Sequence, residues 1–227
     1  MNLPEHYNAL YHDAIQKIKS DNYQIDNLID SSSDNRFGIT LLIRPDKQIR
    51  DAIRKFLSDL KIVEPDQYYY PDSDIHVTVM SIISCYNGFD VAQISVVDYV
   101  EIIRKSIINE KKMKIEFRGI TASPSCILIQ GFLEDDTLTT IRNNLRTNFK
   151  NSNLEQTLDK RYSIQTTHAT VVRFKRALVR KEEFINVLDE YRDFNFGTFE
   201  VDSLELVYND WYHSARHEKE LYRFKIK

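Results

Sequence analysis

The sequence predicts an α+β fold of two lobes that are related by approximate twofold symmetry. Three observations lead to this prediction. Apolar strand patterns alternate with helical ones, this alternation occurs twice in the same order, and each copy contains a His-x-Thr signature in an apolar strand. The two signatures are HVTV at 76–79 and HATV at 168–171, 92 residues apart. Chance similarity rarely preserves both the order of elements and their offsets, so we expect an internal duplication.

The first copy begins with an apolar strand at residues 37–43. A helix is expected at 46–62, with Asp46 as its N-cap and one apolar stripe formed by Ile49, Ile53, Leu57 and Leu60. The signature strand at 74–82 follows a connecting loop. A helix at 91–108 and a strand at 113–120 complete the copy.

The second copy repeats this order. It has a strand at 126–132 and a helix at 134–150, capped by Asp135 or Asp136. The helical stripe consists of Leu138, Ile141, Leu145 and Phe149. The signature strand at 167–171, a helix at 181–194 and a strand at 198–208 follow.

The predicted organisation is therefore a two-lobed domain over residues 37–227, with repeats at about 37–120 and 121–227. Residues 1–36 differ from both repeats. Their helical stripe of Tyr7, Leu10, Ala14 and Ile18 predicts a helical extension packed on the outside.

The two signatures place chemically active side chains on equivalent strands. Successive side chains of a strand point to opposite faces, so His76 shares a face with Thr78, and His168 shares one with Thr170. A twofold arrangement would bring both faces to one groove. One neutral imidazole could then accept a proton from an attacking hydroxyl, and the other, as imidazolium, could protonate the leaving oxygen. Each threonine could donate its hydroxyl to a phosphate oxygen.

The paired motifs resemble those of the 2H phosphoesterase superfamily, which includes bacterial 2'-5' RNA ligases and cyclic nucleotide phosphodiesterases. The resemblance covers about 190 residues in element order. It implies a bilobal α+β fold with antiparallel sheets around a central groove and helices outside. It also implies phosphoesterase activity without a metal or other cofactor, catalytic roles for His76 and His168, and phosphate binding by Thr78 and Thr170.

We expect hydrolysis of a 2',3'-cyclic phosphate, or cleavage and reversible ligation of a 2'-5' phosphodiester, on an RNA end or a small nucleotide. Two alternatives remain open. The enzyme could cleave a signalling nucleotide such as a 2'-5' oligoadenylate or a cyclic oligonucleotide, or the chain could bind RNA or nucleotides without turnover. A zinc hydrolase ranks below both.

Composition limits the partners and the compartment. The formal charge of -3 gives no overall basic field, so long duplex nucleic acid is not an expected partner. Cys85 and Cys126 are far apart and outside any CxxC pattern, which argues against a disulfide framework or a four-thiolate zinc site. No apolar run reaches the roughly 20 residues of a spanning helix. We expect a cytoplasmic monomer that is not associated with a membrane.

Several other residues are weaker candidates. Some family members carry a basic residue after each motif, and Arg173 follows the second one here, but strict alternation places it opposite His168. Tyr68, Tyr69, Tyr70, Trp211 and Tyr212 could stack on a base or serve only as structural aromatics. The basic clusters at 111–114 and 173–181 could guide RNA or form solvated faces.

The other histidines give little signal. His213 and His217 would share a helical face if that segment were a helix, with Asp210 or Glu218 as a further metal ligand, but a solvated charged segment is the favoured interpretation. His6 and His12 lie off-register for one helical face and receive no role.

Overall fold

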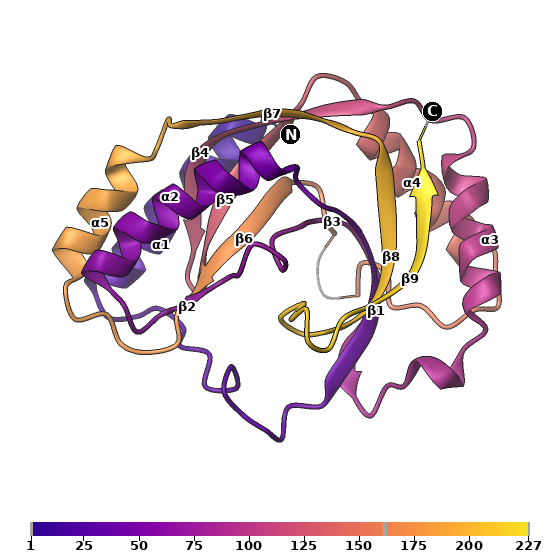
Figure 1. Ribbon diagram of the computed structural model, residues 1–227, viewed down its shortest axis with the longest axis horizontal. Coiled ribbons are helices and arrows are strands. Elements are labelled where there is room, and N and C mark those ends of the chain that lie inside the picture. Colours follow the sequence, from indigo (N-terminus) through magenta and orange to yellow (C-terminus); the bar gives the residue numbers. More distant parts are fainter. Residues whose placement is uncertain (1, 161–162, 227) are drawn as a thin grey trace.

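The computed structural model describes residues 2–160 and 163–226. Within these residues, nine strands form one curled antiparallel sheet (Figure 1). Eight of them follow the order β7-β4-β5-β6-β3-β1-β8-β9, and β2 pairs with β6. The strands are β1 (Arg36–Ile43), β2 (Tyr68–Tyr69), β3 (Val77–Asn87), β4 (Met113–Ser123), β5 (Cys126–Leu133), β6 (Thr167–Arg173), β7 (Asn195–Val201), β8 (Ser203–Asp210) and β9 (Lys219–Lys225). The predicted α+β class is confirmed.

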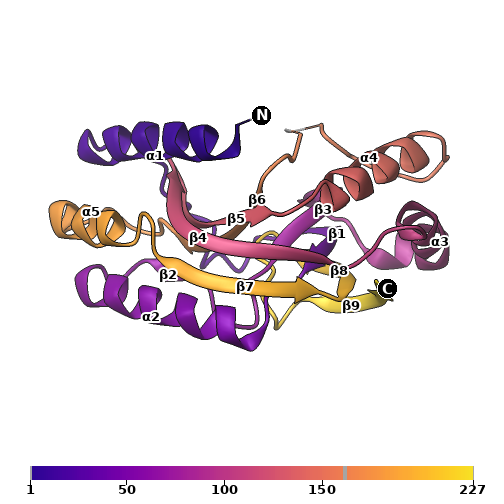
Figure 2. The same ribbon diagram turned by 90° about the horizontal axis from the view of Figure 1, so that it is seen from above.

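Helices flank both ends of this sheet. They are α1 (Leu3–Lys19), α2 (Lys47–Val63), α3 (Val96–Ile107), α4 (Thr137–Lys150) and α5 (Lys181–Glu190). Helices α1, α2 and α5 lie at the β7 end, and α3 and α4 lie at the β9 end (Figure 1). Figure 2 shows α1 and α2 on opposite sides of β4 and β7.

The helices bury the stripes expected from the sequence. Asp46 caps α2 by accepting a hydrogen bond from the Ile49 amide at 2.9 Å. All eight apolar residues of the α2 and α4 stripes are buried. Each fully buried Leu, Ile or Phe side chain stabilises the fold by roughly 1.5–3 kcal/mol, so these stripes anchor the helices to the sheet.

The strands of the two sequence halves are interleaved. On one side of the sheet the order is β4-β5-β6, and on the other it is β8-β1-β3. Strand β4 thus pairs with the second half and β8 with the first. The cause for β4 is local: residues 124–125 are too short a connection for anything but a hairpin, so Ser123 lies opposite Cys126. The repeat boundary expected near residue 120 falls inside β4.

The two signature strands meet at the middle of the sheet. β3 and β6 pair only briefly, with Val77 opposite Ala169. His76 directly precedes Val77, and His168 directly precedes Ala169, so this single pair brings the two motifs side by side. A neighbouring glycine permits the approach of β5 to β6, because a Cβ at Gly131 would collide with the Thr167 carbonyl.

Three segments differ from the sequence prediction. The expected strand at 198–208 is divided at Asp202 into β7 and β8, which occupy distant places in the sheet. The helix expected from residue 91 is a short 3₁₀ turn, Val91–Gln93, followed by α3. After turns at residues 211–218, residues 219–225 form strand β9, which the sequence did not predict.

Helix α1 packs against β4. The Thr121 hydroxyl donates to the Tyr7 carbonyl at 2.8 Å, and Tyr7, Ala14 and Ile18 are fully buried. Leu10 of the same helix reaches the central cleft.

In the described part of the chain, no helix has both the length and the apolar character needed to cross a membrane.

Candidate active site

The signature residues share one cleft of about 580 Å³. His76 and Thr78 line it from the start of β3, and His168 and Thr170 line it from β6. The two motifs thus lie on adjacent strands and line a common space, which is large enough for a small nucleotide.

The His76 ring has a fixed proton on one nitrogen. Nδ1 lies 2.7 Å from the Asp74 carbonyl oxygen. A carbonyl only accepts, so Nδ1–H is the donor and Nε2 carries the lone pair of the neutral ring. Burial, the neighbouring His213 and the Arg44 guanidinium hold the pKa of His76 well below its usual range. His76 is therefore neutral near pH 7 in the free protein, with a nitrogen available as a proton acceptor.

His168 has a more adaptable partner. Its Nδ1 lies 2.7 Å from the Thr166 hydroxyl, which can accept from an imidazolium or donate to a neutral ring. Burial, followed by the charges of Arg142 and His6, lowers the pKa of His168 to about 4. This ring can change protonation state without losing its hydrogen bond.

The depressed histidine pKa values predict a loss of stability in mild acid. The pKa is lowered to about 4 at His168 and to about 3 at His213. Both rings bind protons more readily in the unfolded chain than in the folded one. Their contribution to the free energy of unfolding is therefore complete above about pH 6.5 and declines as the pH falls toward 4. Over this range each ring lowers the free energy of unfolding by up to about 1.4 kcal/mol per pH unit. Urea unfolding midpoints at pH 7.5, 6.5, 5.5 and 4.5 check this, and a midpoint constant from pH 7 to 5 contradicts it.

Arg173 lines the same cleft as His168, so the expectation that it lies on the opposite face is wrong. The reason is a bulge in β6. Ile127 pairs with Val172 and Leu128 with Thr170, which leaves one residue of β6 unpaired. The extra residue reverses the alternation, and Arg173 returns to the face of Thr170. Its Nε donates to the Tyr70 hydroxyl at 2.8 Å.

Arg142 ties the two motif strands together and was missed by the sequence analysis. It is almost fully buried on α4. Its guanidinium donates to the carbonyl oxygens of Thr78, Val79 and Thr166 at 2.9–3.0 Å. The sequence did contain an indication of this role. Arg142 lies four residues after Leu138, on the apolar face of the helix, where a buried charge requires hydrogen-bond partners.

His213 also lines the cleft, and the interpretation of its segment as solvated is wrong for this residue. The His213 side chain is 11% exposed, whereas that of His217 is 43% exposed and pairs with Asp210 at 2.9 Å. The two do not share a helical face, because the segment is a turn.

Within residues 2–160 and 163–226, no group of three or more His, Cys, Asp or Glu side chains is arranged to hold a metal ion.

The aromatic candidates divide into two groups. Trp211 lines the cleft, with the Arg36 guanidinium 4.4 Å from its ring centroid. Tyr70 also lines the cleft, but it is almost fully buried and its hydroxyl accepts from Arg173. Tyr68 and Tyr69 form β2 and Tyr212 is buried, which fits structural roles.

Four lysines of the basic clusters pair with carboxylates. Lys111 pairs with Asp135 at 3.3 Å. Lys112 pairs with Glu200 and Lys175 with Asp30, at 2.7 and 2.6 Å. Lys181 pairs with Asp21 at 2.7 Å. These pairs favour solvated faces over a guide for RNA.

Comparisons with known proteins agree with this arrangement. Residues 42–217 match a family described as the AKAP7 2'5' RNA ligase-like domain. No curated protein sequence matches the chain. Among solved structures, TT0787 of Thermus thermophilus is 15% identical, with a TM-score of 0.59 over 84% of this chain and 97% of that one.

Two further structures show the same likeness. E. coli LigT complexed with 3'-AMP is 12% identical, and a phosphoesterase is 13% identical. Both have a TM-score of 0.57 over 85% of this chain and 99% of the other. At these identities the likeness concerns the fold.

Proposed function

The chain belongs to the family of AKAP7 2'5' RNA ligase-like domains, within the 2H phosphoesterase superfamily, and from this premise we propose a specific reaction. The protein hydrolyses a 2',3'-cyclic phosphate, or cleaves and reversibly joins a 2'-5' phosphodiester, on an RNA end or a small nucleotide. Two histidines carry out the proton transfers. The observation that supports this most strongly is the cleft into which both His-x-Thr motifs project.

For a cyclic phosphate, a water oxygen attacks phosphorus and gives its proton to one imidazole. The bond from phosphorus to one ribose oxygen breaks, and that oxygen takes a proton from the other histidine, which is present as imidazolium. Attack and departure occur on opposite sides of phosphorus, so the reaction needs two proton-transfer groups in one cleft, and His76 and His168 are proposed for these roles. If the 5'-hydroxyl of a second ribose attacks in place of water, the same two proton transfers form a 2'-5' phosphodiester and free the 3'-hydroxyl, which is ligation; attack of that 3'-hydroxyl on the new bond reverses it.

The neutral state of both histidines in the free protein is compatible with this scheme. A bound phosphodiester brings a negative charge next to the rings, which favours protonation of one of them. Thr78 and Thr170 donate hydrogen bonds to the non-bridging phosphate oxygens, and Arg173 supplies a permanent positive charge. Because these donors are fixed on strands, they need little reorganisation as charge develops.

A nucleotide is the proposed occupant of the cleft. Structures of E. coli LigT hold 3'-AMP, ATP and NADP+. In this chain, the Trp211 ring at the cleft is suited to stack on a base, a contact worth roughly 1–3 kcal/mol.

A substrate panel tests the proposal. We expect turnover of 2',3'-cyclic nucleotides or a 2'-5'-linked dinucleotide in the presence of EDTA, with little cleavage of the matched 3'-5' dinucleotide, measured by chromatography of the products. Activity on 2'-5' oligoadenylates or cyclic oligonucleotides alone would change the substrate to a signalling nucleotide. Binding of nucleotides without any product would contradict catalysis and indicate a binding module, and loss of activity in EDTA would contradict the two-histidine mechanism.

A further inference from the structure

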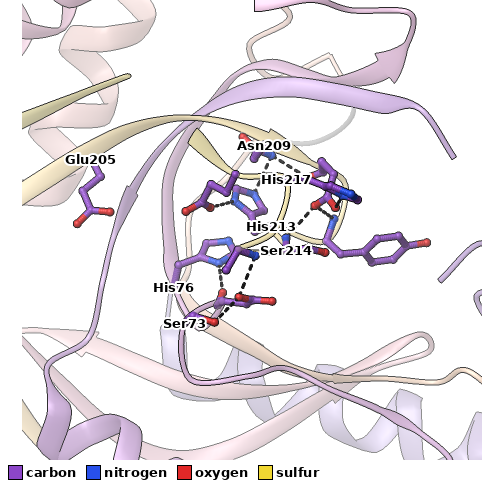
Figure 3. Close-up of polar contacts among 12 residues, drawn as sticks. Ser73, His76, Glu205, Asn209, His213, Ser214 and His217 are labelled. Carbon is purple, nitrogen blue, oxygen red and sulfur yellow. Dashed lines mark hydrogen bonds and ion pairs between the residues drawn. The ribbon is translucent and has the colours of Figure 1, made fainter. Parts of the chain in front are cut away.

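The turn between β8 and β9 lays a third imidazole against His76 (Figure 3). The ring centroids of His76 and His213 are 4.0 Å apart, with 38° between the planes. His213 has a backbone φ of 55°, in the left-handed region that non-glycine residues rarely adopt. Such strain persists where the surrounding structure enforces it, and it concentrates at functional sites.

The orientation of the His213 ring is set from both of its nitrogens. The Asn209 amide nitrogen donates to the Asp210 carbonyl at 2.9 Å, which fixes its identity as the donor. The same nitrogen lies 3.1 Å from His213 Nε2, so Nε2 accepts. On the other side, His213 Nδ1 lies 3.3 Å from a Glu218 carboxylate oxygen and donates to it. Figure 3 shows these contacts around the ring.

A second set of contacts joins this turn to the segment before β3. The Asp74 carboxylate accepts from the Ala215 amide at 3.1 Å, while the Asp74 carbonyl holds His76 Nδ1. Arg44 pairs closely with Glu218, the carboxylate that orients His213. The turn and the His76 segment are therefore fastened to each other by backbone and side-chain bonds together.

We propose that His213 is a positioning residue for the reaction: it holds the His76 imidazole by ring contact and is itself held by Asn209 and Glu218. The proposal rests on the proposed function for its kinetic consequences, but the contact itself is independent of the substrate. With Nδ1 bound to Asp74 and one face covered by His213, the His76 ring is prevented from turning. Its Nε2 edge is the part left to meet a phosphate or its nucleophile.

The electrostatic surroundings of His76 fit the same role. The charged and titratable groups that act on it are His213 and Glu218 of the turn and Arg44 after β1. Two imidazoles in contact do not readily carry protons together, and Arg44 adds a further positive charge. His213 thus helps to keep His76 neutral until substrate arrives.

The first test replaces His213 and compares activity with the state of His76. His213→Asn removes the ring and keeps a residue that tolerates the left-handed backbone. We expect kcat to fall about 10- to 100-fold while KM changes less than about threefold. In NMR titrations of the histidine ring protons, the pKa of His76 should rise toward 6.5. Glu218→Gln should lower kcat by less. It should move the pKa of His76 down rather than up, because it removes a carboxylate whose charge raises that pKa.

A rescue experiment separates ring contact from general damage to the fold. His213→Gly accommodates the left-handed backbone without strain and leaves room for an imidazole. Added imidazole should restore part of kcat in this variant and not in wild type. His217→Asn is the matched control in the same turn, because His217 is partly exposed and its Nδ1 contacts Asp210 and not the His76 ring. It should leave kcat and the titration of His76 unchanged within about twofold.

Unchanged kcat together with an unchanged His76 titration in His213→Asn would overturn the inference, as would a failure of imidazole to restore any activity. A wild-type protein that turns over no member of the panel would contradict the proposed function instead. In that event the NMR titration still decides whether His213 controls His76, since it needs no substrate.

Discussion

Replacing either motif histidine by alanine is expected to reduce turnover by at least about a hundredfold, and by up to about 10⁴-fold. Each histidine provides one of the two proton transfers, and alanine cannot replace it. His76→Ala and His168→Ala should therefore each lower kcat while the protein remains folded. The measurement is kcat and kcat/KM on the best substrate of the panel, with EDTA present and with circular dichroism to confirm folding.

His12→Ala is the matched control, because His12 is an exposed histidine on α1. It should keep kcat within about twofold of wild type. The double variant His76→Ala, His168→Ala should not be much slower than the worse single variant, since groups that act as a unit are strongly non-additive. Activity that survives in both single variants would place the chemistry elsewhere.

Removing the guanidinium of Arg142 is expected to give the largest loss of stability among single changes to the site. Arg142→Met retains the aliphatic length but removes the donors to the Thr78, Val79 and Thr166 carbonyls. A buried acceptor left without its partner costs about 1–3 kcal/mol. We therefore expect the free energy of unfolding in urea to fall by about 3 kcal/mol or more. Because the two motif strands lose a common anchor, kcat should fall as well.

Two further variants make this result specific. Arg142→Lys should recover only part of the loss, because an ammonium lacks the planar fork that reaches several carbonyls. Lys150→Met, at an exposed position of the same helix, should change the unfolding free energy by less than about 0.5 kcal/mol. If Arg142→Met unfolds at the same urea concentration as wild type, these hydrogen bonds contribute no net stability.

Local sequence patterns predicted most of the elements, for a physical reason that can be followed residue by residue. The stripe of Ile49, Ile53, Leu57 and Leu60 is apolar because that face of α2 is buried, and Asp46 precedes it because the first helical amides need an acceptor. The His-x-Thr signatures stood out because a polar face within an apolar strand is uncommon. Their recurrence allowed the shared cleft to be expected.

Arg173 and His213 were misplaced because their positions depend on non-local geometry. Strict alternation fails at β6, where the bulge after Thr170 inserts one residue, and nothing in the letters TVVR marks that position. His213 depends on a turn whose backbone is held by Asp210, which accepts from the Tyr212 and Ser214 amides. A periodicity argument treats such a segment as helix or solvent.

The sequence by itself determined the α+β class and the identity of most helices and strands. It also led to the expectation that His76 and Thr78 line the same cleft as His168 and Thr170. These properties follow from burial and side-chain alternation, which act over a few neighbouring residues. Tertiary structure decided how the halves interleave, that Arg173 enters the cleft, that Arg142 joins both motif strands and that His213 rests on His76. Those contacts join residues far apart in the chain, and their energies depend on which surfaces the folded strands bring together.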